Sequence, residues 1–115
     1  MAELKRVFLY AEFQVSVPFG KDVWATANPA MQAVPGLRNK TWLSGIGTNS
    51  VGGFYEFDSI KNARAYAEGM LADFAKAAGG SLTVKLFDGD VVAEASIGMS
   101  SPFFWAHQNV QQQNR

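Results

Sequence analysis

Two segments rich in strand-forming residues, 37–44 and 51–57, flank the short sequence GIGTNS. Gly, Ser and Asn are typical of tight connections, so the two segments are predicted to pair as an antiparallel hairpin. Charged residues such as Arg38 and Glu56 share these segments with large aromatic residues such as Trp42. A sheet with one solvated face would separate the two kinds of residue more cleanly. The hairpin therefore favours a fold in which both faces of the sheet are covered.

The rest of the chain supplies further strands and helices around this hairpin. Residues 6–15 and 81–88 have the aromatic and branched composition of strands, and a clear helix is predicted from Asp58 or Ser59 to about Ala78. Residues 21–34 are interpreted as a short or broken helix, and 91–97 as a possible fifth strand.

The resulting order is strand, helix, strand, strand, helix, strand. This is the ferredoxin-like βαββαβ arrangement of the α+β class, with an antiparallel sheet and both helices on one face. We expect the spatial order four, one, three, two, with strands numbered along the chain. We expect residues 1–98 to form this domain and residues 99–115 to form a C-terminal arm that is partly docked and then flexible.

Composition excludes several classes of function. Ten basic residues balance ten acidic ones in a chain of 115 residues, which gives no electrostatic sign of nucleic-acid binding. The chain has no Cys and one His, so we predict no metal site, and we expect a cytoplasmic protein without a signal peptide. No apolar stretch is long enough to span a membrane.

Side-chain alternation assigns the strand residues to two faces. The face expected under the helices is mainly apolar and comprises Val7, Leu9, Ala11, Phe13, Leu37, Asn39, Thr41, Leu43, Val51, Gly53, Tyr55, Phe57, Leu82, Val84 and Leu86. The opposite face mixes aromatic and charged residues and comprises Phe8, Tyr10, Glu12, Arg38, Lys40, Trp42, Phe54, Glu56, Lys85 and Phe87. We expect a second subunit to bury this opposite face, with Lys85, Glu12, Glu56 and Lys40 paired in a row across it.

The candidate binding residues lie on the face expected under the helices. Tyr55, Asn39 and Thr41 are predicted to be the polar groups of an apolar pocket, and Tyr55 is alternatively a buried core residue bonded to the backbone. The apolar wall is assigned to four residues that are equally suited to ordinary packing: Phe13, Phe57, Met70 and Phe74.

Three charged or titratable residues are further candidates. Glu12 would be a general base if a dimer interface raised its pKa, and it is alternatively part of a structural ion-pair row. His107 would reach the pocket if the aromatic sequence PFFW docked the C-terminal arm, and it is alternatively solvated. Arg38 would bind a substrate carboxylate or would cover aromatic surface with its stem.

Several sequence motifs together resemble one family. PGLRNKTW, GGFYEF, ARAYAE and VKLFD, with VPFG after the first strand, resemble the YdhR-like mono-oxygenases within the antibiotic-biosynthesis mono-oxygenase group of dimeric α+β barrels. The resemblance covers roughly residues 6–90. It implies a homodimer formed through the sheet, and a hydrophobic pocket between sheet and helices for flat aromatic molecules. Trp42 matches the family's strand-two Trp and so becomes a candidate for shaping the ligand site, or alternatively a core or interface residue.

The resemblance leads to three functional hypotheses. The first is a mono-oxygenase that needs no cofactor, because an aromatic or phenolic substrate anion itself reduces dioxygen. Tyr55, Asn39 and Trp42 would orient the substrate, and Glu12 or His107 would be the base. The second is a non-catalytic protein that binds aromatic ligands. The third is an isomerase, cyclase or dehydratase of the same fold, since this fold carries several kinds of chemistry.

Overall fold

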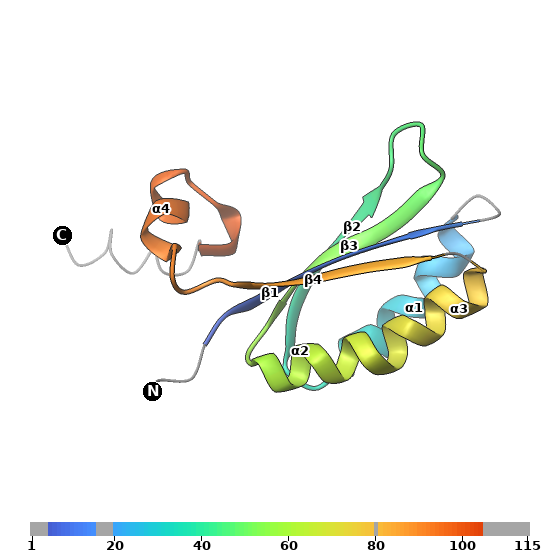
Figure 1. Ribbon diagram of the computed structural model, residues 1–115, viewed down its shortest axis with the longest axis horizontal. Coiled ribbons are helices and arrows are strands. Elements are labelled where there is room, and N and C mark those ends of the chain that lie inside the picture. The colour runs from blue at the N-terminus through green and yellow to red at the C-terminus, as the bar shows by residue number, and fades with distance from the viewer. Residues whose placement is uncertain (1–4, 16–19, 80, 105–115) are drawn as a thin grey trace.

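The computed structural model describes residues 5–15, 20–79 and 81–104. The elements follow the chain in the order β1 (Val7–Gln14), α1 (Lys21–Gln32), β2 (Leu37–Ser44), β3 (Ser50–Phe57), α2 (Ile60–Tyr66), the π-helical turn η1 (Ala67–Leu71), α3 (Ala72–Ala78), β4 (Leu82–Asp88), α4 (Ala93–Gly98) and the 3-10 turn η2 (Pro102–Phe104). The first eight elements form the predicted βαββαβ order, because α2, η1 and α3 are consecutive parts of one helix (Figure 1). The ferredoxin-like α+β prediction is confirmed.

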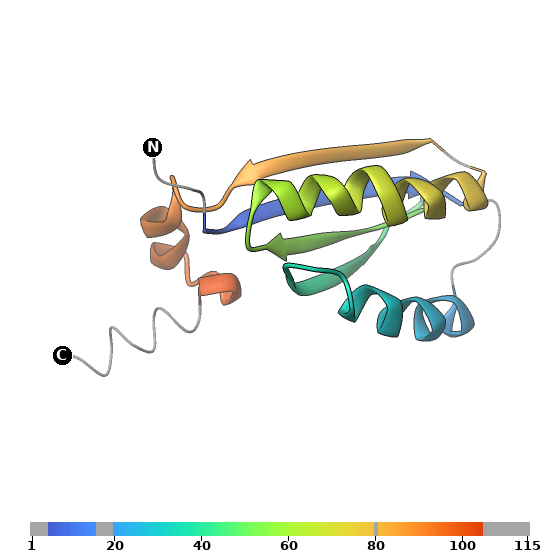
Figure 2. The ribbon, with the colours of Figure 1, turned by 90° about the horizontal axis from the view of Figure 1, so that it is seen from below.

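The four strands form one antiparallel sheet in the order β2-β3-β1-β4, which is the predicted order. Helix α1 and the long helix α2–α3 lie against the same face of the sheet (Figure 2). The core lies between this face and the helices, and its buried side chains are Val7, Leu9, Ala11, Phe13, Val51, Tyr55, Phe57, Ala63, Tyr66, Leu71 and Ala75. We call the face of the sheet that lies under the helices the helix side, and we call the other face the open side.

The long helix begins and ends where its sequence predicts. The Ser59 side chain accepts a hydrogen bond from the backbone N–H of Asn62 at 3.1 Å, which satisfies one free donor of the first turn. Gly79 follows the last turn with a φ of 75°, a left-handed conformation that glycine adopts at little cost. The π-helical turn η1 widens the helix directly after Tyr66.

Helix α1 corrects the expectation of a short or broken helix. It runs without interruption over twelve residues and contains Pro29. Asn28 is therefore inside the helix, where its Oδ1 accepts a hydrogen bond from Trp42 Nε1 at 2.9 Å. This tertiary hydrogen bond provides a reason for Asn28 to stay inside the helix. Only Ala27 and Met31 of α1 are buried, so the helix is held to the sheet along a narrow stripe.

A bulge near the start of β2 corrects the predicted faces of that strand. Leu37 pairs with Phe57, but Asn39 pairs with Glu56, so Arg38 is an extra residue in β2. One inserted residue turns every following side chain to the opposite face. Lys40 and Trp42 therefore lie on the helix side, as Tyr55 does, and the assignments of Asn39, Thr41 and Leu43 to that side are wrong.

The chain after β4 also differs from the prediction. The Asp88 carboxylate accepts the backbone N–H groups of Asp90 and Val91, which turns the chain away from the sheet. The expected fifth strand is instead the short helix α4. Turn η2 then brings Phe103 onto the open side, where its ring centroid lies 5.0 Å from that of Phe54. This part of the open side is therefore covered by the chain itself.

Candidate functional site

Lys40 lies on the helix side with two aromatic rings around its amino group. Its Nζ atom is 3.2 Å from the centroid of the Trp42 ring and 4.6 Å from the centroid of the Tyr55 ring. Helix α1 covers the side of the site that faces away from the sheet, because Met31 Sδ lies 3.2 Å from the same nitrogen. Among the described residues, no carboxylate pairs with this amine. The β2 bulge therefore creates an aromatic-walled amine that alternation alone did not predict.

Gly53 provides the space in which the Lys40 side chain lies. Its position on β3 is opposite Trp42. A Cβ atom at Gly53 would be 2.6 Å from Lys40 Cε and 3.0 Å from the Tyr55 ring. Any side chain at this position would displace the lysine, so the inward position of Lys40 depends on the glycine.

Burial changes the acid–base behaviour of this site. Desolvation lowers the pKa of Lys40 from 10.5 to about 7, so a large share of the amine is unprotonated at neutral pH. An amine with such a pKa is a suitable general base, because it releases and takes up protons near the working pH.

Two tyrosine hydroxyl groups meet on the helix side, where the Tyr55 ring also contacts the lysine. Tyr66 on α2 donates a hydrogen bond to the Tyr55 hydroxyl at 3.0 Å, and both side chains are buried. Burial raises the pKa of Tyr66 to about 12 and also raises the pKa of Tyr55, so both phenols are neutral at pH 7. The expected role of Tyr55 in orienting a ligand stays a prediction.

A cavity of about 190 Å³ opens next to Tyr66, between the end of α1 and the long helix. It is lined by Val34, Pro35, Asn62, Ala65, Tyr66 and Met70. The predicted wall residue Met70 therefore contacts this cavity. Phe13 and Phe57 belong to the packed core, and Phe74 on α3 is partly buried.

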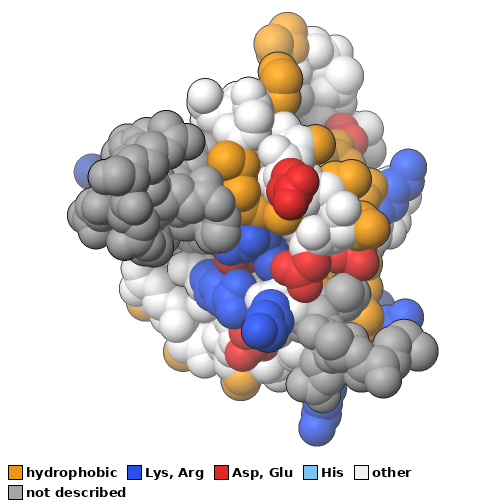
Figure 3. Space-filling model, turned by 90° about the vertical axis from the view of Figure 1, so that its left-hand side faces the viewer, with side chains coloured by type: hydrophobic (Ala, Val, Ile, Leu, Met, Phe, Trp, Pro, Cys, Tyr) orange, Lys and Arg blue, Asp and Glu red, His pale blue; other side chains and the backbone are white. Residues whose placement is uncertain are grey.

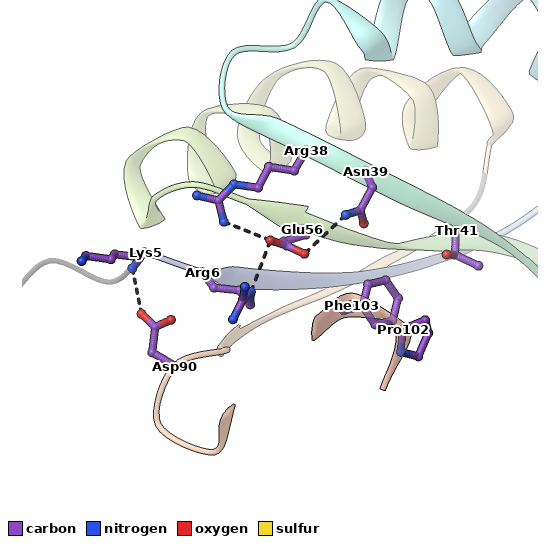
Figure 4. Close-up of a pocket in the computed structure, with 9 residues that line it drawn as sticks. All are labelled: Lys5, Arg6, Arg38, Asn39, Thr41, Glu56, Asp90, Pro102 and Phe103. Atoms are coloured by element: carbon purple, nitrogen blue, oxygen red, sulfur yellow. Dashed lines mark hydrogen bonds and ion pairs between the residues drawn. The ribbon is translucent and has the colours of Figure 1, made fainter. Parts of the chain in front are cut away.

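A larger hollow of about 810 Å³ lies on the open side, at the end of the sheet beside α4 and η2 (Figure 4). Its lining residues are Lys5, Arg6, Arg38, Asn39, Thr41, Glu56, Asp90, Pro102 and Phe103. Basic and acidic side chains gather at this end of the molecule (Figure 3). The sequence-predicted candidates Arg38, Asn39 and Thr41 are thus brought together, but across the sheet from Tyr55.

Glu56 is the centre of the polar contacts in this hollow. Its side chain is almost completely buried, and its Oε2 accepts hydrogen bonds from Arg38 Nη1 at 2.9 Å and from Arg6 Nε at 3.3 Å. Its Oε1 accepts a hydrogen bond from Asn39 Nδ2 at 3.3 Å. Arg6 was not among the candidates predicted from the sequence, because it precedes β1 and carries no motif.

The predicted charged row across the sheet does not form. In the strand register, Glu56 of β3 is opposite Phe8 of β1, whereas Glu12 is opposite Gly52 and Lys85 is opposite Tyr10. Lys40 lies on the other face. The cause is the strand register together with the β2 bulge, which place these charges at different heights or on different sides.

Of the two predicted bases, Glu12 has an unexpected environment. Its Oε1 accepts a hydrogen bond from the Tyr10 hydroxyl at 2.6 Å. This bond, assisted by Ser50, lowers the pKa of Glu12 in the single chain. The raised pKa expected in a dimer interface stays a prediction. The other predicted base, His107, lies outside the described residues.

Two features are absent from the described residues. No group of three His, Asp or Glu side chains there is placed to hold a metal ion. In the same ranges, no helix has both the length and the apolar character needed to cross a membrane.

The sheet order, the helices on one face and the aromatic-walled amine between them define a ferredoxin-like α+β protein with a candidate site on the helix side. Residues 8–98 match the model of the family described as "Putative mono-oxygenase ydhR". The match spans more than half of the chain, so the protein belongs to this family, and the resemblance found in its sequence motifs is confirmed. A search of curated proteins found no match to the chain.

Proposed function

We propose that the protein is a mono-oxygenase that oxidises a phenolic compound with dioxygen and needs no bound cofactor. The observation that carries the proposal is Lys40, an amine with a pKa of about 7 between the rings of Trp42 and Tyr55. A neutral amine removes the proton of a phenol, and the resulting ammonium stabilises the phenolate. Lys40 thus replaces Glu12 and His107 as the proposed base.

The volume and the lining of the cavity on the helix side favour a small substrate. The cavity beside Tyr66 is smaller than the roughly 300 Å³ of typical drug-binding pockets, which suits a compound with one aromatic ring. We place the substrate ring against Tyr66 and Met70, with a hydroxyl group directed toward Lys40. Helix α1, which buries only Ala27 and Met31 and is tied to β2 by the hydrogen bond from Trp42 to Asn28, is the wall we expect to move to admit it.

For a hydroquinone the reaction balances as follows. Lys40 takes a proton from one hydroxyl group, and the anion transfers electrons to O2 as a bond forms between a ring carbon and oxygen. The Lys40 ammonium returns its proton to the peroxide. The O–O bond then breaks, the hydrogen on that ring carbon leaves with the outer oxygen as water, and a carbonyl remains. Hydroquinone and O2 thereby give a hydroxyquinone and water.

A second candidate is a non-catalytic binder of the same ligands. The observation that favours it is that the Tyr55 and Tyr66 hydroxyls already bond to each other, and that the polar side chains lining the cavity are those of Asn62 and Tyr66. A binder would retain ligand affinity without consuming oxygen.

We also propose that the part of the open side around Tyr10, Leu43 and Phe87, none of which lines the hollow, forms a homodimer interface. Phe87 is 47 % exposed and Leu43 is 37 % exposed on this face, and Tyr10 lies between them in the sheet. Apolar and aromatic exposure of this kind marks contact surfaces. A native mass spectrum of the purified protein tests this: a dimer supports the interface, and a stable monomer refutes it.

Oxygen uptake tests the enzymatic proposal. We would measure O2 consumption with hydroquinones, and with anthrone as a larger substrate, and compare Lys40→Met with Lys40→Arg. Arginine keeps the positive charge but does not act as a base near neutral pH. Both variants should lose turnover while Lys61→Met, on the exposed surface of α2, retains it.

The outcomes separate the two candidates. Equal amounts of O2 consumed and quinone formed, with a rate that rises through about pH 7, support the mono-oxygenase. Ligand binding that needs Lys40 but consumes no oxygen supports the binder. Turnover that is unchanged in Lys40→Met refutes the role of Lys40.

A further inference from the structure

We propose that the hollow on the open side is a second binding site, which takes a small aromatic carboxylate. It lies across the sheet from Lys40, because the β2 bulge directs Asn39 and Thr41 to the open side and Lys40 to the helix side. Its volume of about 810 Å³ falls in the range of roughly 300–1,000 Å³ typical of ligand sites. The proposal does not depend on the mono-oxygenase activity.

Two guanidinium groups are held in position at the floor of the hollow. Glu56 accepts one N–H from Arg6 and one from Arg38, and Figure 4 shows both arginines converging on it from β2 and from the start of β1. A guanidinium has five N–H donors, so each arginine keeps donors beyond those that bind Glu56. The Arg38 side chain is 42 % exposed, and an incoming acceptor can therefore reach it.

Arg6 is fixed by a second contact. Its guanidinium carbon lies 4.2 Å from the centroid of the Phe104 ring in η2. This stacking and the bond to Glu56 restrict the arginine to one orientation. Little side-chain entropy then remains to be lost when an anion binds, which is the condition for a pre-formed site.

The charges that line the hollow favour an anion. Three basic side chains, Lys5, Arg6 and Arg38, face two carboxylates, Glu56 and Asp90. Glu56 lies beneath its donors as a buried partner, so the solvent side of the arginines stays open to a further acceptor. One added carboxylate balances the lining charge and forms charge-assisted hydrogen bonds.

An apolar wall beside the arginines selects the body of the ligand. Phe103 and Pro102 line the hollow, and the Phe103 ring packs on Phe54 at 5.0 Å and on Phe8 at 5.5 Å between centroids. These contacts hold Phe103 in place, so its free surface is available for an aromatic ring. A flat ring that carries a carboxylate satisfies the wall and the arginines together.

Titration of the protein with 2-naphthoate, measured by calorimetry and by NMR shift changes, tests the site. The neutral compound 2-naphthalenemethanol is titrated in the same way for comparison with the acid. We expect wild type to bind 2-naphthoate below about 1 mM and the alcohol about tenfold more weakly. Arg38→Gln should weaken 2-naphthoate about tenfold, because Glu56 keeps Arg6 and Asn39 as partners while the ligand loses its exposed donor. Arg64→Gln, an exposed arginine on α2, is the matched control and should bind as wild type does.

Two further variants keep the test decisive. Phe103→Ala should weaken 2-naphthoate and leave inorganic phosphate, a probe for the arginines alone, unaffected. Lys40→Met should bind 2-naphthoate as wild type does, which separates this site from the proposed oxidation. The proposal is overturned if the alcohol binds as well as the acid, if Arg38→Gln binds unchanged, or if wild type fails to bind at about 10 mM.

Discussion

Replacement of Lys40 by Met should stabilise the protein while it removes the proposed base. Folding lowers the pKa of Lys40 from 10.5 to about 7, because the amine loses hydration on the helix side. That change corresponds to roughly 5 kcal/mol at about 1.4 kcal/mol per pKa unit. The amine is only partly buried, so solvent screening reduces the expected gain to about 2 kcal/mol. Methionine keeps the apolar stem and the contacts with Trp42 and Met31.

The gain should depend on pH in a defined direction. Between about pH 7 and 10.5 the unfolded chain holds the Lys40 proton and the folded chain does not, so wild-type stability rises with pH in that window. Lys40→Met lacks this dependence. Its advantage is therefore largest near and below pH 7 and disappears toward pH 10.5.

Urea unfolding of both proteins at about pH 6.5 and about pH 9.5 measures this difference. Lys61→Met, with an exposed lysine, is the control and should show little change at either pH. A difference between wild type and Lys40→Met that is the same at both pH values would refute the lowered pKa. If Lys40→Met were much less stable than wild type at both pH values, the contacts of the ammonium with the aromatic rings would outweigh the cost of its dehydration.

Three further substitutions test other parts of the structure. Gly53→Ala should push Lys40 out of its place and raise its pKa toward 10.5, which an NMR titration of the lysine side chain would detect; an unchanged pKa contradicts the packing argument. Glu56→Gln should cost about 2 kcal/mol in urea unfolding, because two arginines lose their anionic partner, and equal stability to the exposed control Glu68→Gln would contradict it. Ser59→Ala should cost about 1 kcal/mol through the lost helix cap, also measured by urea unfolding, and no loss would mean that solvent replaces the cap.

Local signals in the sequence predicted the order of elements and the sheet. Alternating apolar residues in the strands, the cap at Ser59 and the terminating Gly79 each act over a few residues, so they are readable without tertiary information. The long helix and the strand order followed from these signals. The continuity of α1 did not, because Asn28 is held by a hydrogen bond from Trp42, a residue on another element.

The candidate site was predicted only in part. Tyr55 and Trp42 were identified, and Tyr55 was placed on the correct face. Lys40 was assigned to the wrong face, since alternation assumes an uninterrupted pairing of β2 with β3. The hollow on the open side was missed because Arg6 and Phe104 are distant in the sequence and meet only when η2 folds back over the sheet.

The sequence by itself determined the α+β class, the antiparallel sheet, the two helices over one face and the family, because repeated short-range patterns encode them redundantly. Tertiary structure alone decided the chemistry of the site. A single extra residue, Arg38, reverses the rest of β2, which brings Lys40 into a poorly hydrated place between two rings and lowers its pKa. The cost of dehydrating one amine depends on what surrounds it in space, and no local pattern records those surroundings.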